Sequence, residues 1–272
     1  MIDAQEGEAG ALSDAAFKAI RELLYAASGI KLASGKRELV RSRVIRRLRD
    51  LGLRSFDVYV SRLASDPAEV ARMVDVMTTN KTSFFREPPH FAFFAERLPA
   101  WRRAGRRLRV WSAGCSTGEE PYSIAMLLIE QLPDIAQWDA RILGTDISER
   151  VLGVARAGDY SSSALAELDA KRRSRFFELS ERGGLLLPEP RALVKLARLN
   201  LLGPWPMRGP FDVIFCRNVM IYFDEQTRMQ LAQRYRELLA PGGLLFIGHS
   251  ESLGPSPPGL SVIRPSIYTR AE

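Results

Sequence analysis

The alternation of short apolar runs with amphipathic stretches after residue 105 is the feature that most constrains the fold. In order, these segments read LRVWSA, PYSIAMLLIEQL, ARILGTDI, FDVIFCRNV, a helical stretch beginning near Asp224, and GLLFIGHS. Such strand, helix, strand repetition indicates parallel strands joined by right-handed crossovers. No helix separates GLLFIGHS from the strand-like segment 260–268, which predicts an antiparallel last strand. We therefore expect an α/β fold with an open, doubly wound, Rossmann-like sheet.

One stretch interrupts the alternation. Between a helix near 165–177 and Asn200 lie three short strand-like pieces, FFEL, GGLLLPEP and ALVKLARL, with a Gly-Gly turn between the first two. We expect them to form a small β subdomain inserted at 174–199.

The first third of the chain has a helical pattern and no strand signal. Apolar residues at three- and four-residue spacing predict a helix that begins after Ser13 and ends at Gly29. Further helices are expected up to Gly52, at 56–63 and at 67–77. We therefore predict an all-helical domain over 13–79, preceded by a disordered tail over 1–12.

Size and charge narrow the class of protein. A chain of 272 residues suggests one large domain with a smaller companion. The formal charge of +7 predicts an acidic partner, which could be nucleic acid, an anionic membrane or an acidic protein. No apolar run is long enough to span a bilayer and the first residues lack a signal-peptide pattern, so we expect a cytoplasmic protein without membrane insertion. Cys115 and Cys216 are predicted to be reduced core thiols.

The loop after the first predicted strand is a candidate ligand site. In an open α/β sheet, ligands bind in the crevice beyond the carboxyl ends of the strands. Gly114 and Gly118 let the backbone turn sharply and approach a ligand closely. Their spacing is not the Gly-x-Gly-x-x-Gly of dinucleotide folds, and Glu119 and Glu120 would repel phosphate. The same carboxylates would attract the ammonium and sulfonium groups of S-adenosylmethionine (SAM), so the loop favours SAM over NAD.

Three polar residues follow the other predicted strands. Asp146 could accept hydrogen bonds from both ribose hydroxyls, although it could instead cap the helix that starts at 147 or 148. Asn200 follows the third strand, where its amide could contact adenine, and Asn218 closes the fourth. A structural cap or turn remains open for both asparagines.

Four motifs carry a resemblance to a known family. They are NKTSFFRE at 80–87, WSAGCSTGEEPYS at 111–123, FCRNVMIYF at 215–223 and GHSE at 248–251. In this order they resemble the CheR family of chemotaxis protein glutamate O-methyltransferases, over about 13–268. The resemblance implies a helical N-terminal domain, a SAM-binding α/β domain and a β subdomain inserted in it. These coincide with the segmentation from the pattern, in which a linker and cofactor-contacting segment at 80–104, with a short helix after Pro89, precedes the α/β domain at 105–272.

The resemblance also implies site residues. Arg86 and Tyr222 would lie near the transferred methyl group, with S-adenosylhomocysteine (SAH) as the product. A glutamate substrate is already ionised near pH 7, so alignment rather than a general base is expected to drive the reaction. The residues that would line the cofactor site, together with Gly114 of the loop, are Asn80, Thr82, Arg86, Glu120, Asp146, Asn200, Leu201, Arg217 and Asn218.

Partners follow from the charge and from the resemblance. Arg41, Arg43 and Arg47 would lie on the outer face of a basic helix, which is either a solvated surface or a site for the acidic helical bundle of a chemoreceptor. The β subdomain could add a strand from a receptor's C-terminal peptide, but the prolines of GGLLLPEP argue against this. We expect a monomer.

Three alternatives stay open or are disfavoured. A nucleic-acid methyltransferase would explain the basic charge, but Cys216-Arg217-Asn218-Val219 lacks the Asp/Asn-Pro-Pro-Tyr/Phe motif of amino-methylating enzymes. A module that binds SAM and signals through partners without catalysis is another alternative, and intact Arg86 and Tyr222 argue against it. A metal site is not expected, because neither histidine has a second candidate ligand nearby in the sequence.

Overall fold

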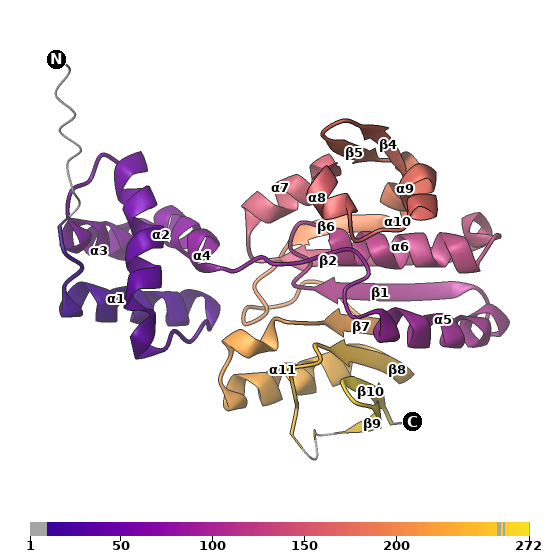
Figure 1. Ribbon diagram of the computed structural model, residues 1–272. Coiled ribbons are helices and arrows are strands. Elements are labelled where there is room, and N and C mark those ends of the chain that lie inside the picture. The colour runs from indigo at the N-terminus through magenta and orange to yellow at the C-terminus, as the bar shows by residue number, and fades with distance from the viewer. Residues whose placement is uncertain (1–9, 255–256, 258, 272) are drawn as a thin grey trace. The chain divides into compact units, whose positions relative to one another are not determined.

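The chain divides after Thr79 into two compact units in the computed structural model (Figure 1). The structure describes residues 10–254, 257 and 259–271. Residues 1–9 of the predicted tail lie outside the described residues. The rest of that prediction is wrong, because Leu12 is buried and its carbonyl oxygen accepts a hydrogen bond from Arg37. The helical unit therefore begins before Ser13.

The first unit is helical, as predicted. Ser13 caps its first helix by accepting a hydrogen bond from the Ala16 amide, and Gly29 ends it in the left-handed conformation, with φ of 71°. Apolar side chains at helical spacing, including Val40, Val44 and Leu48, form the core. The elements are α1 (Asp14–Ser28), the 3-10 turn η1 (Ser34–Lys36), α2 (Arg37–Asp50), α3 (Phe56–Ser65) and α4 (Pro67–Met77).

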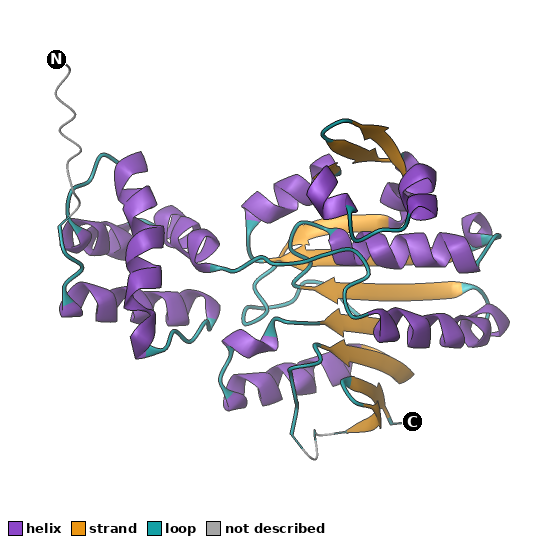
Figure 2. Ribbon diagram, viewed as in Figure 1, coloured by secondary structure: helices purple, strands orange, loops and turns teal. Residues whose placement is uncertain are grey.

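The second unit contains a seven-stranded sheet in the order β6-β2-β1-β7-β8-β10-β9 (Figure 2). The first five strands of this order run parallel, while β10 pairs antiparallel with both β8 and β9. The predicted α/β fold is confirmed, although the single strand expected over 260–268 is a hairpin. The strands are β1 (Arg107–Ala113), β2 (Asp139–Asp146), β6 (Val194–Arg198), β7 (Phe211–Cys216), β8 (Leu239–Ile247), β9 (Leu260–Arg264) and β10 (Ile267–Arg270).

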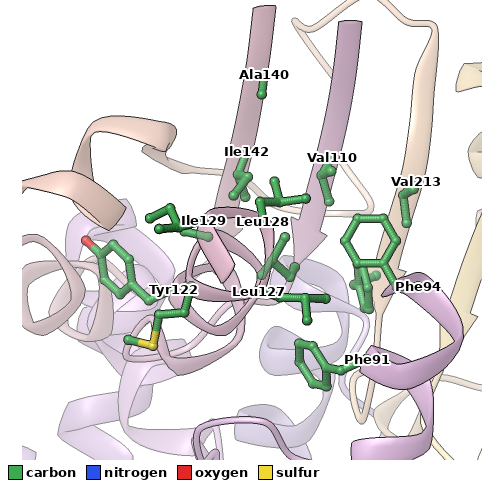
Figure 3. Close-up of a cluster of buried hydrophobic side chains, with 14 of the residues drawn as sticks. Phe91, Phe94, Val110, Tyr122, Leu127, Leu128, Ile129, Ala140, Ile142 and Val213 are labelled. Atoms are coloured by element: carbon green, nitrogen blue, oxygen red, sulfur yellow. The ribbon is translucent and has the colours of Figure 1, made fainter. Parts of the chain in front are cut away.

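Helices cover both faces of this sheet. On one face, α5 (Pro88–Arg103) and α6 (Glu119–Gln131) pack Phe91, Phe94 and Leu128 against Val110 and Val213 (Figure 3). The other face holds α11 (Glu225–Leu238). The helix expected after Pro89 is present as α5, and its aromatic side chains belong to the core of the second unit rather than to a linker. The remaining elements on this sheet are η2 (Ile135–Gln137), α7 (Glu149–Ala157), α10 (Pro188–Leu193) and η3 (Met220–Tyr222).

A second, three-stranded antiparallel sheet forms the insertion, in the order β3-β5-β4. Its bounds differ from the predicted 174–199, because the piece ALVKLARL pairs with β2 in the main sheet as β6. In its place, the upstream strand β3 pairs with β5. The elements of this small sheet are β3 (Asp159–Ser161), α8 (Ser162–Leu165), α9 (Ala170–Phe176), β4 (Phe177–Ser180) and β5 (Gly183–Leu186).

Two further predictions concern the whole chain. Cys115 and Cys216 are buried free thiols, as expected. Among the described residues, no helix is both long and apolar enough to cross a membrane.

Candidate functional site

The loop after β1 lies where the carboxyl ends of β1 and β2 meet. The amides of Gly114 and Cys115 both donate to the Thr145 carbonyl oxygen at 2.8 Å, which turns the chain away from the strand. Gly114 has φ of 88°, and a Cβ there would lie 2.3 Å from Cγ2 of Val219. A glycine is therefore required both by the backbone conformation and by the close approach of the segment after β7.

Asp146 joins this loop to the end of β2. Its Oδ2 accepts from the Ser116 amide at 2.9 Å, and its Oδ1 accepts from the Ser148 amide at 3.0 Å. The cap of α7 is Ser148, whose hydroxyl accepts from the Val151 amide, so the alternative of Asp146 as the helix cap is wrong. A carboxylate has about four acceptor sites, and Asp146 uses at least two of them to tie the loop after β1 to the start of α7.

Arg217, which follows β7, is the centre of a buried charge cluster. Its side chain is only 2% exposed, and its guanidinium lies 3.1 Å from Glu120 Oε2 and 3.0 Å from Glu87 Oε2. The same guanidinium donates to the carbonyl oxygen of Arg86. Two carboxylates against one guanidinium leave a formal charge of −1, in a place where few water molecules can screen it.

The pKa values in this cluster show how the charges are balanced. Burial alone would raise the pKa of Glu87, but Arg217 and the His249 amide outweigh it, so that pKa lies below its ordinary value. Burial raises the pKa of Glu120, and Arg217 and the Ser112 hydroxyl only partly oppose this. One guanidinium therefore stabilises only one of the two carboxylates fully. A further positive group beside Glu120 would be stabilised, which fits the ammonium and sulfonium charges of SAM.

Glu251 holds the segment that follows β7. Its buried carboxylate accepts hydrogen bonds from the amides of Gly248 at 2.6 Å, Asn218 at 2.9 Å and Ile221 at 3.1 Å. Burial raises the pKa of Glu251, and these amides oppose the rise. The carboxylate thus fixes the turn that leads into η3 and positions Tyr222.

Most of the other predicted cofactor residues contact the loop after β1 or the Arg217 cluster. The Asn80 carbonyl oxygen accepts a hydrogen bond from the Ser116 hydroxyl at 3.1 Å, so the motif at 80–87 contacts the loop after β1, which we call the cofactor loop. Arg86 donates to the Lys81 carbonyl oxygen at 2.9 Å. The Asn218 amide group donates to Glu87 Oε1 at 3.4 Å. Thr82 is partly buried within the same motif.

The segment after β6 also reaches the crevice. The Leu199 amide donates to the Asp146 carbonyl oxygen at 2.9 Å, so Asn200 lies one residue from that contact. Asn200 Oδ1 accepts from the Leu202 amide at 3.0 Å, as the turn alternative predicts. The Leu201 side chain is buried, and its carbonyl oxygen accepts from Trp205 at 3.1 Å.

Both histidines lie beside Glu87, contrary to the reasoning from sequence spacing. One ligand atom each from Glu87, His90 and His249 lie within 4.8 Å of one another. Burial, followed by the charge of Arg217, lowers the pKa of His90 to about 4, so His90 is neutral at pH 7. A metal ion here would compete with Arg217 for the same Glu87 oxygen. Arg217 already occupies that oxygen, and the absence of a metal stays a prediction.

Comparisons with known proteins agree with this geometry. Residues 80–266 match the family described as CheR methyltransferase, SAM binding domain, and residues 15–78 match the CheR methyltransferase all-alpha domain. The chain belongs to the CheR methyltransferase family.

Three relatives show how far the similarity extends. The chemotaxis protein methyltransferase of Klebsiella aerogenes is 46% identical over 248 residues, which cover 89% of this chain and 84% of the relative. The protein of the same name in Escherichia coli is 45% identical over 250 residues, covering 89% and 86%. The probable chemotaxis protein methyltransferase of Rhizobium etli is 43% identical over 239 residues, covering 84% and 89%.

In this CheR methyltransferase, two of the three predicted substrate arginines have structural contacts. Arg47 makes two hydrogen bonds to the fully buried Glu69, at 3.0 and 2.8 Å. Arg43 donates to the carbonyl oxygens of Met77 and Thr78. The prediction that both lie on an outer face is wrong, because helical spacing turns them toward α4. The exposed arginines of α2 are Arg41, Arg46 and Arg49.

Sequence reasoning missed several residues that organise the CheR site. Glu87 and Glu251 lie in the quoted motifs but were given no role, and His90 lies just beyond the first motif. The feature that could have indicated them is their position in the sequence, since Glu87 directly follows Arg86 and Glu251 follows a predicted strand. Their partners are up to 176 residues away in the chain, and that separation hides the cluster from local patterns.

Proposed function

We propose that this chain transfers the methyl group of SAM to glutamate side chains of chemoreceptors, giving glutamate methyl esters and SAH for sensory adaptation. The observation that carries the proposal is the Arg217 cluster, whose two carboxylates leave a negative charge beside Arg86. The relatives named as chemotaxis protein methyltransferases support the same substrate class.

The chain's own residues can hold both reactants. When bound, SAM supplies a methyl group on a positively charged sulfur. Glu120 would receive the positive charge, Asp146 the ribose hydroxyls, and the backbone at Gly114 would allow close approach. These carboxylates favour a cationic ligand over a phosphate-bearing one.

The incoming glutamate needs orientation more than activation. It is ionised near pH 7, so no residue has to remove a proton. Arg86, once released from the Lys81 carbonyl, would bind one carboxylate oxygen and leave the other to attack. The Tyr222 hydroxyl, fixed through the Glu251 turn, would direct the attacking lone pair. Alignment and removal of water are the contributions expected from such a site.

Labelled SAM and receptor cytoplasmic fragments test the substrate. The chain should place label on the fragments, and alkali should release it as volatile methanol, because methyl esters hydrolyse in base. Fragments whose acceptor glutamates are replaced by glutamine should stay unlabelled. Label that resists alkali, or no transfer to any fragment, would contradict the proposal.

Substitution of Arg86 tests the proposed role of that residue. Arg86→Ala should lower turnover about 100-fold, a typical cost of lost substrate orientation. The melting temperature should stay near that of the wild type, because the partly exposed Arg86 side chain donates a hydrogen bond to the Lys81 carbonyl oxygen and is not part of the core. The exposed Arg103 on α5 supplies a matched control, since Arg103→Ala removes the same charge and should leave turnover unchanged.

Recognition of the receptor is proposed to use the exposed arginines of α2. Arg41, Arg46 and Arg49 face solvent and could attract an acidic helical bundle, mainly by speeding encounter. A receptor peptide could also pair with the edge strand β4, because the prolines that argued against this lie in α10 rather than in a strand. Removal of the receptor's last residues should lower methylation if this tether is used, and unchanged methylation would contradict it.

A further inference from the structure

The segment that carries Arg86 has an unfavourable backbone. Phe85 has φ of 50° and Glu87 has φ of 59°, so residues with left-handed backbones stand on both sides of Arg86. Side chains other than glycine, asparagine and aspartate rarely adopt this conformation, which persists only where surrounding contacts enforce it. Contacts outside the segment must therefore hold it.

Phe85 is held from two sides. Its amide donates to the Ser123 hydroxyl oxygen at 2.8 Å. On the ring side, the guanidinium carbon of Arg172 lies 3.8 Å from the ring centroid, well within the range of a cation–π contact. Arg172 comes from α9, next to the small sheet.

Arg172 is itself fixed in place. Its guanidinium makes two hydrogen bonds of 2.9 Å to the carboxylate oxygens of Glu130 on α6. A paired contact of this kind sets the plane of the guanidinium as well as its position. The charged plane over Phe85 is therefore oriented by the helix that follows the cofactor loop.

The small sheet contacts the neighbouring residue as well. Phe84 packs edge-on against Tyr160 of β3, with centroids 5.0 Å apart, and against Phe177 of β4, at 5.7 Å. The Tyr160 hydroxyl donates to the Thr117 carbonyl oxygen in the cofactor loop at 2.8 Å. The insertion therefore touches both the Arg86 segment and the cofactor loop.

We propose that Arg172 is a positioning residue for methyl transfer, which acts by bracing Phe85 so that Arg86 faces the substrate. Without the brace, the segment relaxes from its left-handed conformation and the Arg86 carbonyl moves away from Arg217. The activity readout of this proposal rests on the proposed function. Arg217 keeps its contacts with Glu87 and Glu120 when the Arg86 carbonyl moves, and Gly114 and Asp146 lie outside the segment, so cofactor affinity should fall far less than turnover.

Arg172→Gln tests the brace, because kcat should fall while the affinity for SAH is kept. Its kcat should fall about tenfold, which corresponds to about 1.4 kcal/mol of transition-state stabilisation. The Kd for SAH, measured by calorimetry, should stay within about twofold of the wild type. Lys171→Gln is the matched control, because it removes one positive charge from an exposed position of the same helix and should change neither quantity.

A partial rescue and a double substitution separate positioning from general damage. Arg172→Lys keeps a cation but loses the paired contact with Glu130, so its kcat should lie between those of Arg172→Gln and the wild type. Because both residues act through one brace, adding Glu130→Gln to Arg172→Gln should lower kcat little further. Additive losses would contradict the proposal.

Hydrogen exchange gives a readout that does not depend on the substrate. In Arg172→Gln, amides within 80–87 should exchange faster while those of the β1 and β7 strands keep wild-type rates. This outcome supports the brace even if the wild type methylates no receptor, a result that would reject the proposed function alone. Unchanged exchange at 80–87, wild-type kcat, or loss of SAH binding together with kcat would overturn the assignment of Arg172.

Discussion

The two units each bury an arginine beside carboxylates, but with a different balance of charge. In the helical unit the carboxylates of Glu69 and Asp50 are matched by the guanidiniums of Arg47 and Arg72. In the helical unit, the buried carboxylate of Glu69 meets two guanidiniums, from Arg47 at 2.8 Å and Arg72 at 3.5 Å, and the Tyr59 hydroxyl at 2.9 Å. In the methyltransferase unit, one guanidinium, that of Arg217, is shared between two carboxylates.

The pKa values reflect this difference. Burial would raise the pKa of Glu69, yet Arg47 and Tyr59 outweigh burial, so that pKa is lowered. For Glu120, burial wins and the pKa is raised. A buried cluster whose charges are fully compensated serves the fold, whereas one with uncompensated negative charge can bind a cation. The comparison therefore separates a structural cluster from the proposed ligand site, which has the same residue types.

The largest effect is expected from a substitution that breaks the structural cluster around Glu69. Glu69→Ala leaves the mostly buried Arg47 without its main partner, which should cost about 3–5 kcal/mol of unfolding free energy. Urea unfolding of the full chain, followed by circular dichroism, measures this loss. SAH affinity should be retained, because the proposed cofactor residues all belong to the other unit. A chain as stable as the wild type would contradict the structural role of Glu69.

The next effect concerns His90 at the edge of the ligand cluster. Its pKa of about 4 lies below the ordinary 6.5, so the unfolded state binds the proton more readily than the folded state. The stability from neutral His90 is therefore full above pH 6.5 and is lost as the pH falls to about 4. The shift corresponds to about 3 kcal/mol.

Unfolding in urea at several pH values checks this prediction. The difference in unfolding free energy between the wild type and His90→Gln should change by about that amount between pH 7 and pH 4. A constant difference between wild type and His90→Gln would count against a buried neutral imidazole.

A smaller effect is expected at Arg217. Arg217→Lys keeps the positive charge but cannot reach Glu87, Glu120 and the Arg86 carbonyl together. Loss of charged hydrogen bonds of this kind should weaken SAH binding by about 1.5–3 kcal/mol, roughly 10- to 100-fold. Calorimetry measures the affinity for SAH. Wild-type affinity in Arg217→Lys would show that simultaneous hydrogen bonds from one guanidinium to all three partners are not needed.

The smallest effect concerns α2. Reversal of the exposed Arg41, Arg46 and Arg49 to glutamate should change stability by no more than about 0.5 kcal/mol per site. The proposed receptor methylation should slow, because encounter with an acidic bundle loses its attraction. Arg47→Glu is the contrasting variant, which should destabilise the helical unit. If Arg47→Glu were as stable as the reversals at Arg41, Arg46 and Arg49, the distinction between the buried and exposed faces of α2 would be wrong.

The sequence predicted the elements best where one local pattern decides them. Ser13, Gly29 and the alternating apolar runs located the first helix, the parallel strands and the cofactor loop, because capping and strand periodicity are local. The family motifs placed Arg217 and Asn218 at the end of β7. The apolar run ARILGTDI placed Asp146 at the end of β2.

The errors arose where the sheet of a strand, or the direction of a side chain, depends on partners that are distant in the sequence. ALVKLARL reads as a short strand, but only pairing with β2 assigns it to the main sheet. Asp159–Ser161 has no apolar run, so its strand is set by its partner β5. Arg47 repeats with a helical period, yet its inward direction depends on Glu69, 22 residues away. The neutral His90 depends on burial that no spacing rule shows.

Calorimetric titration of SAH into the wild type, Glu120→Gln and Glu69→Gln tests the central claim most directly. The account predicts one binding site in the wild type, at least about tenfold weaker binding in Glu120→Gln, and wild-type affinity in Glu69→Gln. Absence of heat in the wild type, or equal affinity in all three proteins, would contradict it.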